Sequence, residues 1–214
     1  MESQGKITEN QKKILVLDTS MFTDPQSRKW LGQNTSSSIG TFLKLASYAK
    51  DLQFYMPRSI RDELVNLAGT DIPLLDTQVI IKSPSKFDLS IPSALFYEFL
   101  DDLRMRMDKG LRVTEDFIRK DQDLSTEERI KKLRERYRTA LRDGIVDSKE
   151  DFEVILLAME LKGIIVTADK GLTKYADKAG IAIIDAHVFP EFLIYEVEKY
   201  NPNIIGMIKE KEMW

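Results

Sequence analysis

The stretch GIIVTADKGLTKYADKAGIAIID, residues 163–185, decides the fold of this chain. It begins with an apolar segment typical of a buried strand, 163–169, continues with a segment typical of a helix, 171–180, and ends in a second apolar segment, 181–185. Strands that are apolar on both faces and alternate with helices are typical of parallel sheets covered on both sides. The stretch therefore predicts an α/β fold.

The same alternation extends outward along the chain in both directions. A helix is expected over 148–162, before this stretch, and another near 190–200, after it. Nearer the N-terminus the pattern predicts a strand in KILVLD (13–18), a helix over 38–50, a strand in QFYMP (53–57), a helix over 59–69 that Gly69 closes, and a strand in VIIK (79–82). The predicted architecture is a mainly parallel central sheet flanked by helices.

Residues 84–146 break this rhythm, because two long helices follow each other with no strand between them. Pro92 begins the first helix, and the second runs from about Thr126 to Asp143. Each helix carries an apolar stripe that must pack against the other helix, the core or another subunit. The stripes are Leu95, Phe99, Leu103 and Met107 on the first helix, and Ile130, Leu133, Tyr137, Ala140 and Leu141 on the second.

We interpret these two helices as a helical hairpin, residues 84–144, inserted into an α/β core. The core is then discontinuous and consists of residues 13–83 and 145–200. Residues 201–214 are left as a C-terminal tail. At 214 residues, one domain with an insertion is the expected organisation.

The composition excludes several kinds of chemistry. The chain has no cysteine and a single histidine, His187, so disulfides, thiol catalysis and thiolate metal sites are ruled out. A zinc site or a serine triad would depend on His187 alone, for which a packing or helix-capping role is the simpler interpretation. Hydrolytic chemistry in this chain must therefore use carboxylates.

No apolar run reaches the length of a membrane span; VILLAMEL is eight residues long and contains Glu160. The first thirteen residues, MESQGKITENQKK, lack the hydrophobic stretch of a signal peptide. We therefore expect a cytoplasmic protein that does not associate with membranes.

Acidic residues crowd the start of one predicted helix, in GIVDSKEDFEVILLA, residues 144–158. Asp147 can cap this helix, with Glu150 completing a capping-box-like pair. Asp147 and Asp151, however, lie four residues apart and share one face of the helix, where two carboxylates repel each other. A cation between them would relieve that repulsion.

Two further acids end strands: Asp18 in VLDTS and Asp169 in VTADK. Parallel sheets bind ligands at the carboxyl ends of their strands, although each acid could also serve only as a turn or helix cap. If Asp18, Asp147, Asp151 and Asp169 meet at one edge of the sheet, they are unstable unless some are protonated or a cation lies among them. Because the ligands are hard oxygens, we predict Mg²⁺, with Mn²⁺ able to substitute; Glu63 is a secondary candidate ligand.

The second hairpin helix is strongly basic in a chain whose net charge is −3. RIKKLRERYRTALR, residues 129–142, holds seven basic residues and one acidic residue. Arg134, Arg138 and Arg142 form one stripe at helical spacing. The stripe indicates a polyanionic partner or a solvated helix face, and Arg129, Lys132 and Arg136 are secondary candidates for the same contact.

The order of VLDTS, RDEL, DSKED and VTADK resembles a PIN nuclease domain, over residues 13–82 and 145–200. The long insertion between RDEL and DSKED is similar to that of the protein-only ribonuclease P group known as HARP, homologues of the Aquifex ribonuclease P. The resemblance implies removal of the 5′ leader from precursor tRNA without an RNA subunit. It also implies that Asp18, Asp147, Asp151 and Asp169 bind metal, that the basic helix contacts tRNA, and that the insertion builds a large homo-oligomer.

The expected reaction is metal-assisted phosphodiester hydrolysis that leaves 5′-phosphate and 3′-hydroxyl ends. Two other functions are compatible with the sequence. One is a different PIN endoribonuclease, such as a toxin or a partner of RNA ligase. The other is a non-catalytic RNA-binding scaffold whose acids only cap helices.

Overall fold

A five-stranded sheet, all parallel, forms the centre of the molecule in the computed structural model, with strand order β3-β2-β1-β4-β5. The structure describes residues 12–69, 75–120, 125–142, 148–204 and 206. The strands are β1 (Lys13–Leu17), β2 (Leu52–Met56), β3 (Val79–Ile81), β4 (Ile164–Thr167) and β5 (Ile183–Asp185). The predicted α/β fold with a parallel sheet is confirmed.

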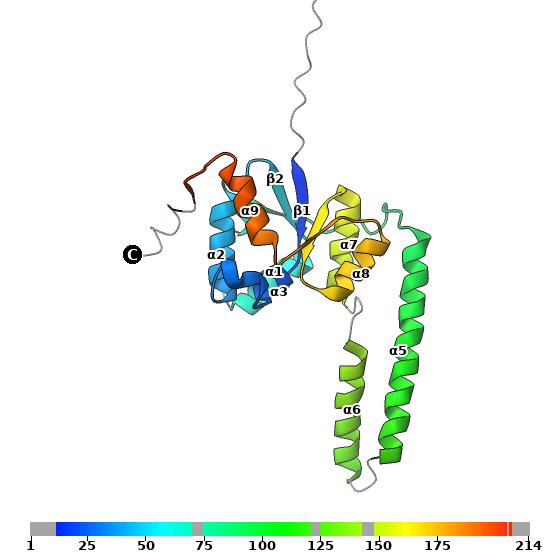
Figure 1. Ribbon diagram of the computed structural model, residues 1–214. Helices are drawn as coiled ribbons and strands as arrows, with labels where there is room; N and C mark the ends of the chain where they lie inside the picture. The colour runs from blue at the N-terminus through cyan, green and yellow to red at the C-terminus, as the bar shows by residue number, and fades with distance from the viewer. Residues whose placement is uncertain (1–11, 70–74, 121–124, 143–147, 205, 207–214) are drawn as a thin grey trace, which may run out of the picture.

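Helices cover both faces of this sheet (Figure 1). On one side lie α2 (Thr35–Ala46) and α9 (Phe189–Glu198), and on the other side lie α7 (Lys149–Leu161) and α8 (Lys170–Lys178). The central strand β1 is covered from both sides, because Leu15, Val16 and Leu17 are fully buried. Burial of consecutive residues explains why β1 and β4 are mainly apolar rather than alternating, whereas β2 alternates between buried and partly buried residues.

The strand order creates the crevice in which a site is expected. The chain leaves β1 toward β2 and β3 on one side, and later adds β4 and β5 on the other side. In open parallel sheets, ligands bind outside the carboxyl ends of the two strands where the order reverses. Here these strands are β1 and β4, and the pairing of Leu17 with Val166 makes Asp18 and Thr167 neighbours at that edge.

Most predicted elements of the core are present, with shifted ends. The helix α3 (Arg58–Ala68) ends at Gly69, whose φ of 68° is the left-handed conformation that favours glycine. The helix predicted over 38–50 begins earlier, because Asn34 rather than the serine run caps α2; its side chain accepts a hydrogen bond from the Ser37 amide. The short helices α1 (Ser20–Thr23), η1 (Ser27–Trp30) and α4 (Leu75–Gln78) were not predicted.

The two hairpin helices are present and lie side by side, extending away from the sheet (Figure 1). They are α5 (Ser93–Lys120), which is 28 residues long, and α6 (Thr126–Arg142). Tyr137 of α6 lies directly against Gly110 of α5, where an added Cβ would come within 2.6 Å of the tyrosine ring. Part of the apolar stripe of α6 therefore packs against α5. The other hairpin helix was one of the three packing partners that the sequence allowed, beside the core and another subunit.

None of the helices in the described part of the chain is both long and apolar enough to cross a membrane. Residue 205 and residues 207–214, most of the expected C-terminal tail, lie outside that part. The division into core, insertion and tail stays a prediction.

Candidate active site

Asp18 follows β1 directly and is almost completely buried, with 3% of its surface exposed. Its Oδ1 accepts a hydrogen bond from the Thr19 amide at 2.7 Å. Its Oδ2 accepts hydrogen bonds from the Ser20 hydroxyl at 2.5 Å and from the Thr167 hydroxyl at 2.7 Å. The carboxylate is thus held in one orientation at the carboxyl end of the central strand, as the sequence predicted.

Burial raises the pKa of the Asp18 carboxyl, against the opposing effect of hydrogen bonds from Ser20 and Thr167. A buried carboxylate is costly in its charged form unless a positive charge compensates it. Asp18 therefore sits where a cation would be stabilising.

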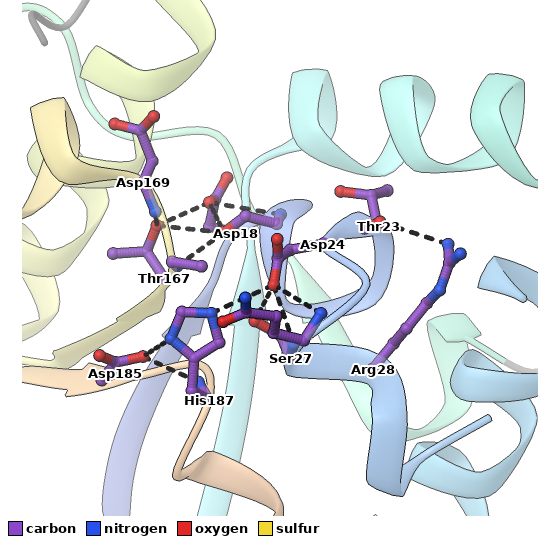
Figure 2. A network of polar contacts seen from close by, with 12 residues as sticks. Asp18, Thr23, Asp24, Ser27, Arg28, Thr167, Asp169, Asp185 and His187 are labelled. Atoms are coloured by element: carbon purple, nitrogen blue, oxygen red, sulfur yellow. Dashed lines mark hydrogen bonds and ion pairs between the residues drawn. The ribbon is translucent and has the colours of Figure 1, made fainter. Parts of the chain in front are cut away.

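Asp169 lies two residues after β4 and caps α8, because its Oδ1 accepts a hydrogen bond from the Leu172 amide at 2.7 Å. The sequence allowed a role as helix cap for Asp169, and the structure confirms this role. The hydroxyl of Thr167, which donates to Asp18, accepts a hydrogen bond from the Asp169 amide at 3.0 Å. Asp18 and Asp169 are consequently linked through one buried threonine (Figure 2).

The start of α7 differs from the prediction. Its cap is Ser148, whose side chain accepts a hydrogen bond from the Asp151 amide at 3.0 Å, so the proposed pair of Asp147 and Glu150 does not cap it. Asp147 itself lies outside the described residues. Among the acids at this helix start, Glu153 is engaged elsewhere, with Ser59 at 2.6 Å and with Lys86 at 2.5 Å.

An open cleft of about 660 Å³ lies where these elements meet, between α3 and the first turns of α7 and α8. Asp151, Asp169 and Glu63 all line it, as three of the acids predicted from the sequence. Sequence reasoning did not assign Asp62 or Glu150 to the site, although both line the cleft as well. We call this hollow the acid cleft.

Glu63, which lines the acid cleft, interacts electrostatically with the buried carboxylate of Asp18. The pKa of Glu63 is raised by burial and by the negative charges of Asp18 and Glu150. A bound cation would relieve the repulsion that raises the pKa of Glu63. The donors are hard oxygens, which suit Mg²⁺ or Mn²⁺.

The described acids do not complete a metal site by themselves. Within residues 12–69, 75–120, 125–142 and 148–204, no three histidine, aspartate or glutamate side chains are grouped closely enough to hold a metal ion. The nature of the donors therefore fits a divalent cation, while the full ligand set predicted from the sequence stays a prediction.

His187 does not cap the helix that follows it, which was one of the two roles expected from the sequence. Its Nε2 lies 3.1 Å from Asp24 and its Nδ1 lies 2.8 Å from Asp185, so the ring bridges two carboxylates (Figure 2). The residue that caps α9 is Val188. The bridge joins the segment after α1 to the end of β5, next to the strand ends that carry the acids.

Arg134 and Arg138 are exposed on α6, and neither has an ion-pair partner among the described residues. Arg136 lies elsewhere on the helix, with its guanidinium 5.4 Å from the centre of the Phe117 ring of α5. The side chain of Arg142 lies outside the described part. In the predicted basic stripe, Arg134 and Arg138 are thus exposed and can contact a partner.

Thr167 gives the first testable prediction for this site. Thr167→Val removes the hydroxyl that orients Asp18 and supports the Asp169 backbone, without changing the size of the buried side chain. Asp18 is a metal ligand in the prediction from the sequence, and the loss of a contact that orients such a ligand typically costs about 10–100-fold in activity. We expect that loss in the RNA cleavage rate, whereas Thr167→Ser keeps the hydroxyl and should retain most activity. Equal rates for the two variants would contradict the positioning role.

Comparison with known proteins agrees with the fold. A parallel sheet with an acid cleft at its switch point is the arrangement of a PIN-type nuclease domain, and the family described as PINc domain ribonuclease matches residues 14–198. A protein of Thermococcus kodakarensis is 46% identical over 193 residues, which cover 86% of this chain and 96% of that protein. One of Thermodesulfovibrio yellowstonii is 42% identical over 185 residues, which cover 86% and 94%. Both are named RNA-free ribonuclease P. This chain belongs to the RNA-free ribonuclease P family of PIN-domain ribonucleases.

Proposed function

We propose that this chain is an RNA-free ribonuclease P, an endoribonuclease that removes the 5′ leader from precursor tRNA and needs no RNA subunit. The observation that carries the proposal is that acids of α3, of the first turn of α7 and of the cap of α8 line one open cleft at the switch point of the sheet, where the buried Asp18 acts electrostatically on Glu63. Relatives named RNA-free ribonuclease P, at 42–46% identity over most of the chain, support the same activity.

In this proposal the acids of the cleft hold Mg²⁺, for which Mn²⁺ can substitute. A divalent cation bound there would activate water and neutralise the charge that develops on the phosphate. Asp18, Asp151 and Asp169 would be ligands together with Asp147, and Glu63 is a further candidate. Ser20 and Thr167 would keep Asp18 oriented while the cation and the substrate exchange.

The products would be a 5′-phosphate on the tRNA and a 3′-hydroxyl on the leader, because water rather than the RNA is the nucleophile. The Ser20 and Thr167 hydroxyls both donate hydrogen bonds to Oδ2 of Asp18, and the Thr19 amide donates to Oδ1. These hydroxyls are therefore engaged in positioning and are poor candidates for nucleophiles.

The basic stripe of α6 would hold the body of the precursor. Arg134 and Arg138 are exposed on a helix that extends away from the core, so they can reach phosphates distant from the cut. Arg142 would extend the same stripe. Arg129, Lys132 and Arg136 are weaker candidates, because Arg136 is stacked on Phe117 and Arg129 lines a hollow between the hairpin helices.

Self-association through the insertion is the second part of the proposal. The outer half of α5 exposes Met107 and Leu111, at 65% and 59%, and such a pair on one helix face is a common feature of protein interfaces. Met107→Glu with Leu111→Glu should reduce the molar mass measured by light scattering. Leu133→Glu with Tyr137→Glu is a poorer test, because Tyr137 packs within the hairpin itself.

The cytoplasmic location expected from the sequence stays a prediction.

The experiment that tests the activity is incubation of the purified protein with 5′-labelled precursor tRNA and Mg²⁺, with the cut mapped to the nucleotide. We expect one cut, at the junction of leader and mature tRNA, in a preparation free of RNA. Cuts inside the anticodon or elsewhere would indicate a different PIN endoribonuclease. Binding without any cut at saturating Mg²⁺ would indicate an RNA-binding scaffold.

A further inference from the structure

A second hollow lies beside the acid cleft, on the other side of the start of α7. It has a volume of about 540 Å³ and is mainly apolar, with aromatic walls from three helices. Phe96 and Phe99 come from α5, Phe152 from α7 and Tyr175 from α8. We call this hollow the aromatic groove.

The groove is continuous with the proposed catalytic site. Ser148 and Lys149 line both the aromatic groove and the acid cleft, so the two hollows meet at the first residues of α7. An extended ligand whose phosphate lies in the acid cleft can therefore place its next group in the aromatic groove. This continuity favours a part of the substrate as occupant over a separate partner.

The charged residues of the groove, Arg106 and Lys149, are both basic. Arg106 lines it, and within the part of the chain that the structure describes two guanidinium nitrogens of Arg106, Nε and Nη2, are buried without a hydrogen-bond partner. The nearby buried carboxylate Asp102 is paired instead with Lys174, at 3.0 Å. Arg106 can turn toward an acceptor in the groove without giving up a hydrogen bond, and Lys149 at its edge is largely exposed.

We propose that the aromatic groove is a nucleobase subsite, which takes the base of the unpaired leader nucleotide immediately upstream of the scissile phosphate. Aromatic side chains with an arginine are the chemistry that recognises an unstacked base, through stacking and contacts to its edge. A base within a duplex is stacked on its neighbours, so only an unpaired nucleotide can enter. This inference rests on the proposed function and adds a determinant of where the cut falls.

The test compares two precursors that differ by one base. One carries an intact leader, and the other an abasic residue directly upstream of the cut. Stacking of a base on protein aromatics contributes about 1–3 kcal/mol, so kcat/KM of the unaltered enzyme should fall about five- to a hundred-fold on the abasic precursor. Phe99→Ala should cleave the intact precursor with a similar loss and show little further loss on the abasic one.

Tyr97→Ala is the matched control, because Tyr97 lies on the same helix, is 69% exposed and does not line the groove. It should behave like the unaltered enzyme on both precursors. Light scattering and thermal melting of Phe99→Ala should be unchanged, since this side chain is already 47% exposed.

Two outcomes would overturn the inference. If the unaltered enzyme cleaves both precursors equally well, the groove does not bind the base. If Phe99→Ala lowers the molar mass and loses the same factor on both precursors, the groove is a contact between copies of the chain. Failure of the proposed function looks different, because the intact precursor would then not be cut at the leader junction at all.

Discussion

Asp18→Asn is expected to lower the rate of precursor tRNA cleavage by on the order of a thousand-fold, while leaving the fold intact. The substitution removes the charge that attracts a cation but keeps the size of a side chain that is 3% exposed. Because burial raises the pKa of Asp18, its charged form destabilises the metal-free protein, and the neutral amide should not lower the melting temperature. Single-turnover rates at saturating Mg²⁺ and thermal melting by circular dichroism measure both effects.

Asp151→Asn, Asp169→Asn and Asp147→Asn should also abolish most cleavage. Asp177→Asn is a suitable control, because Asp177 lies on the exposed part of α8 and does not line the acid cleft. Asp169 has a second role as a helix cap, which the oxygen of an asparagine side chain can also fill, so the melting temperature of Asp169→Asn should change little. Near-normal cleavage by Asp18→Asn at saturating Mg²⁺ would refute the metal-site assignment.

Arg134→Ala with Arg138→Ala is expected to weaken tRNA binding and to flatten its dependence on salt. Each lost phosphate contact removes roughly one unit, or somewhat less, from the slope of log affinity against log salt concentration. Filter binding across a salt series measures this slope. Binding of Mn²⁺ at the acid cleft should be unaffected, because the arginines lie on a helix outside the core.

Arg129→Ala with Arg136→Ala removes the same charge from residues associated with α5, and is the matched control. If both double variants change affinity and slope equally, the effect is one of net charge and the stripe has no specific role. If the Arg134 and Arg138 variant binds tRNA like the unaltered protein, α6 is not the tRNA-contacting element.

The sequence was sufficient for the fold and for the position of two acids at the edge of the sheet, because β1 and β4 are mainly apolar runs that each lead into one acid. Since the sheet is parallel, Asp18 and Asp169 had to come to the same edge. The hydroxyl groups that link them, Ser20 and Thr167, stand in the same short motifs, VLDTS and VTAD. Their role depends on the register of β1 against β4, which the sequence does not reveal.

The cap of α7, the partners of His187 and two acids of the cleft could not be predicted from the sequence, because they depend on how the chain folds. Asp147 and Ser148 are both good helix caps, and only the backbone geometry selects Ser148. The bridge made by His187 joins residues more than 160 positions apart, so no local pattern could indicate its partner Asp24. Asp62 and Glu150 resemble ordinary surface acids of amphipathic helices, and only the packing of α3 near α7 brings them to one cleft.

The chemistry of the cut ends tests the central claim most directly, that the acid cleft supports hydrolysis by water. A precursor tRNA with a single 2′-deoxy nucleotide just upstream of the scissile phosphate is cleaved beside the unmodified precursor, and the end groups are analysed. We predict cleavage of both, with a 5′-phosphate on the tRNA and a 3′-hydroxyl on the leader. A 2′,3′-cyclic phosphate on the leader, together with no cleavage of the deoxy precursor, would show attack by the RNA's own 2′-hydroxyl and contradict the account.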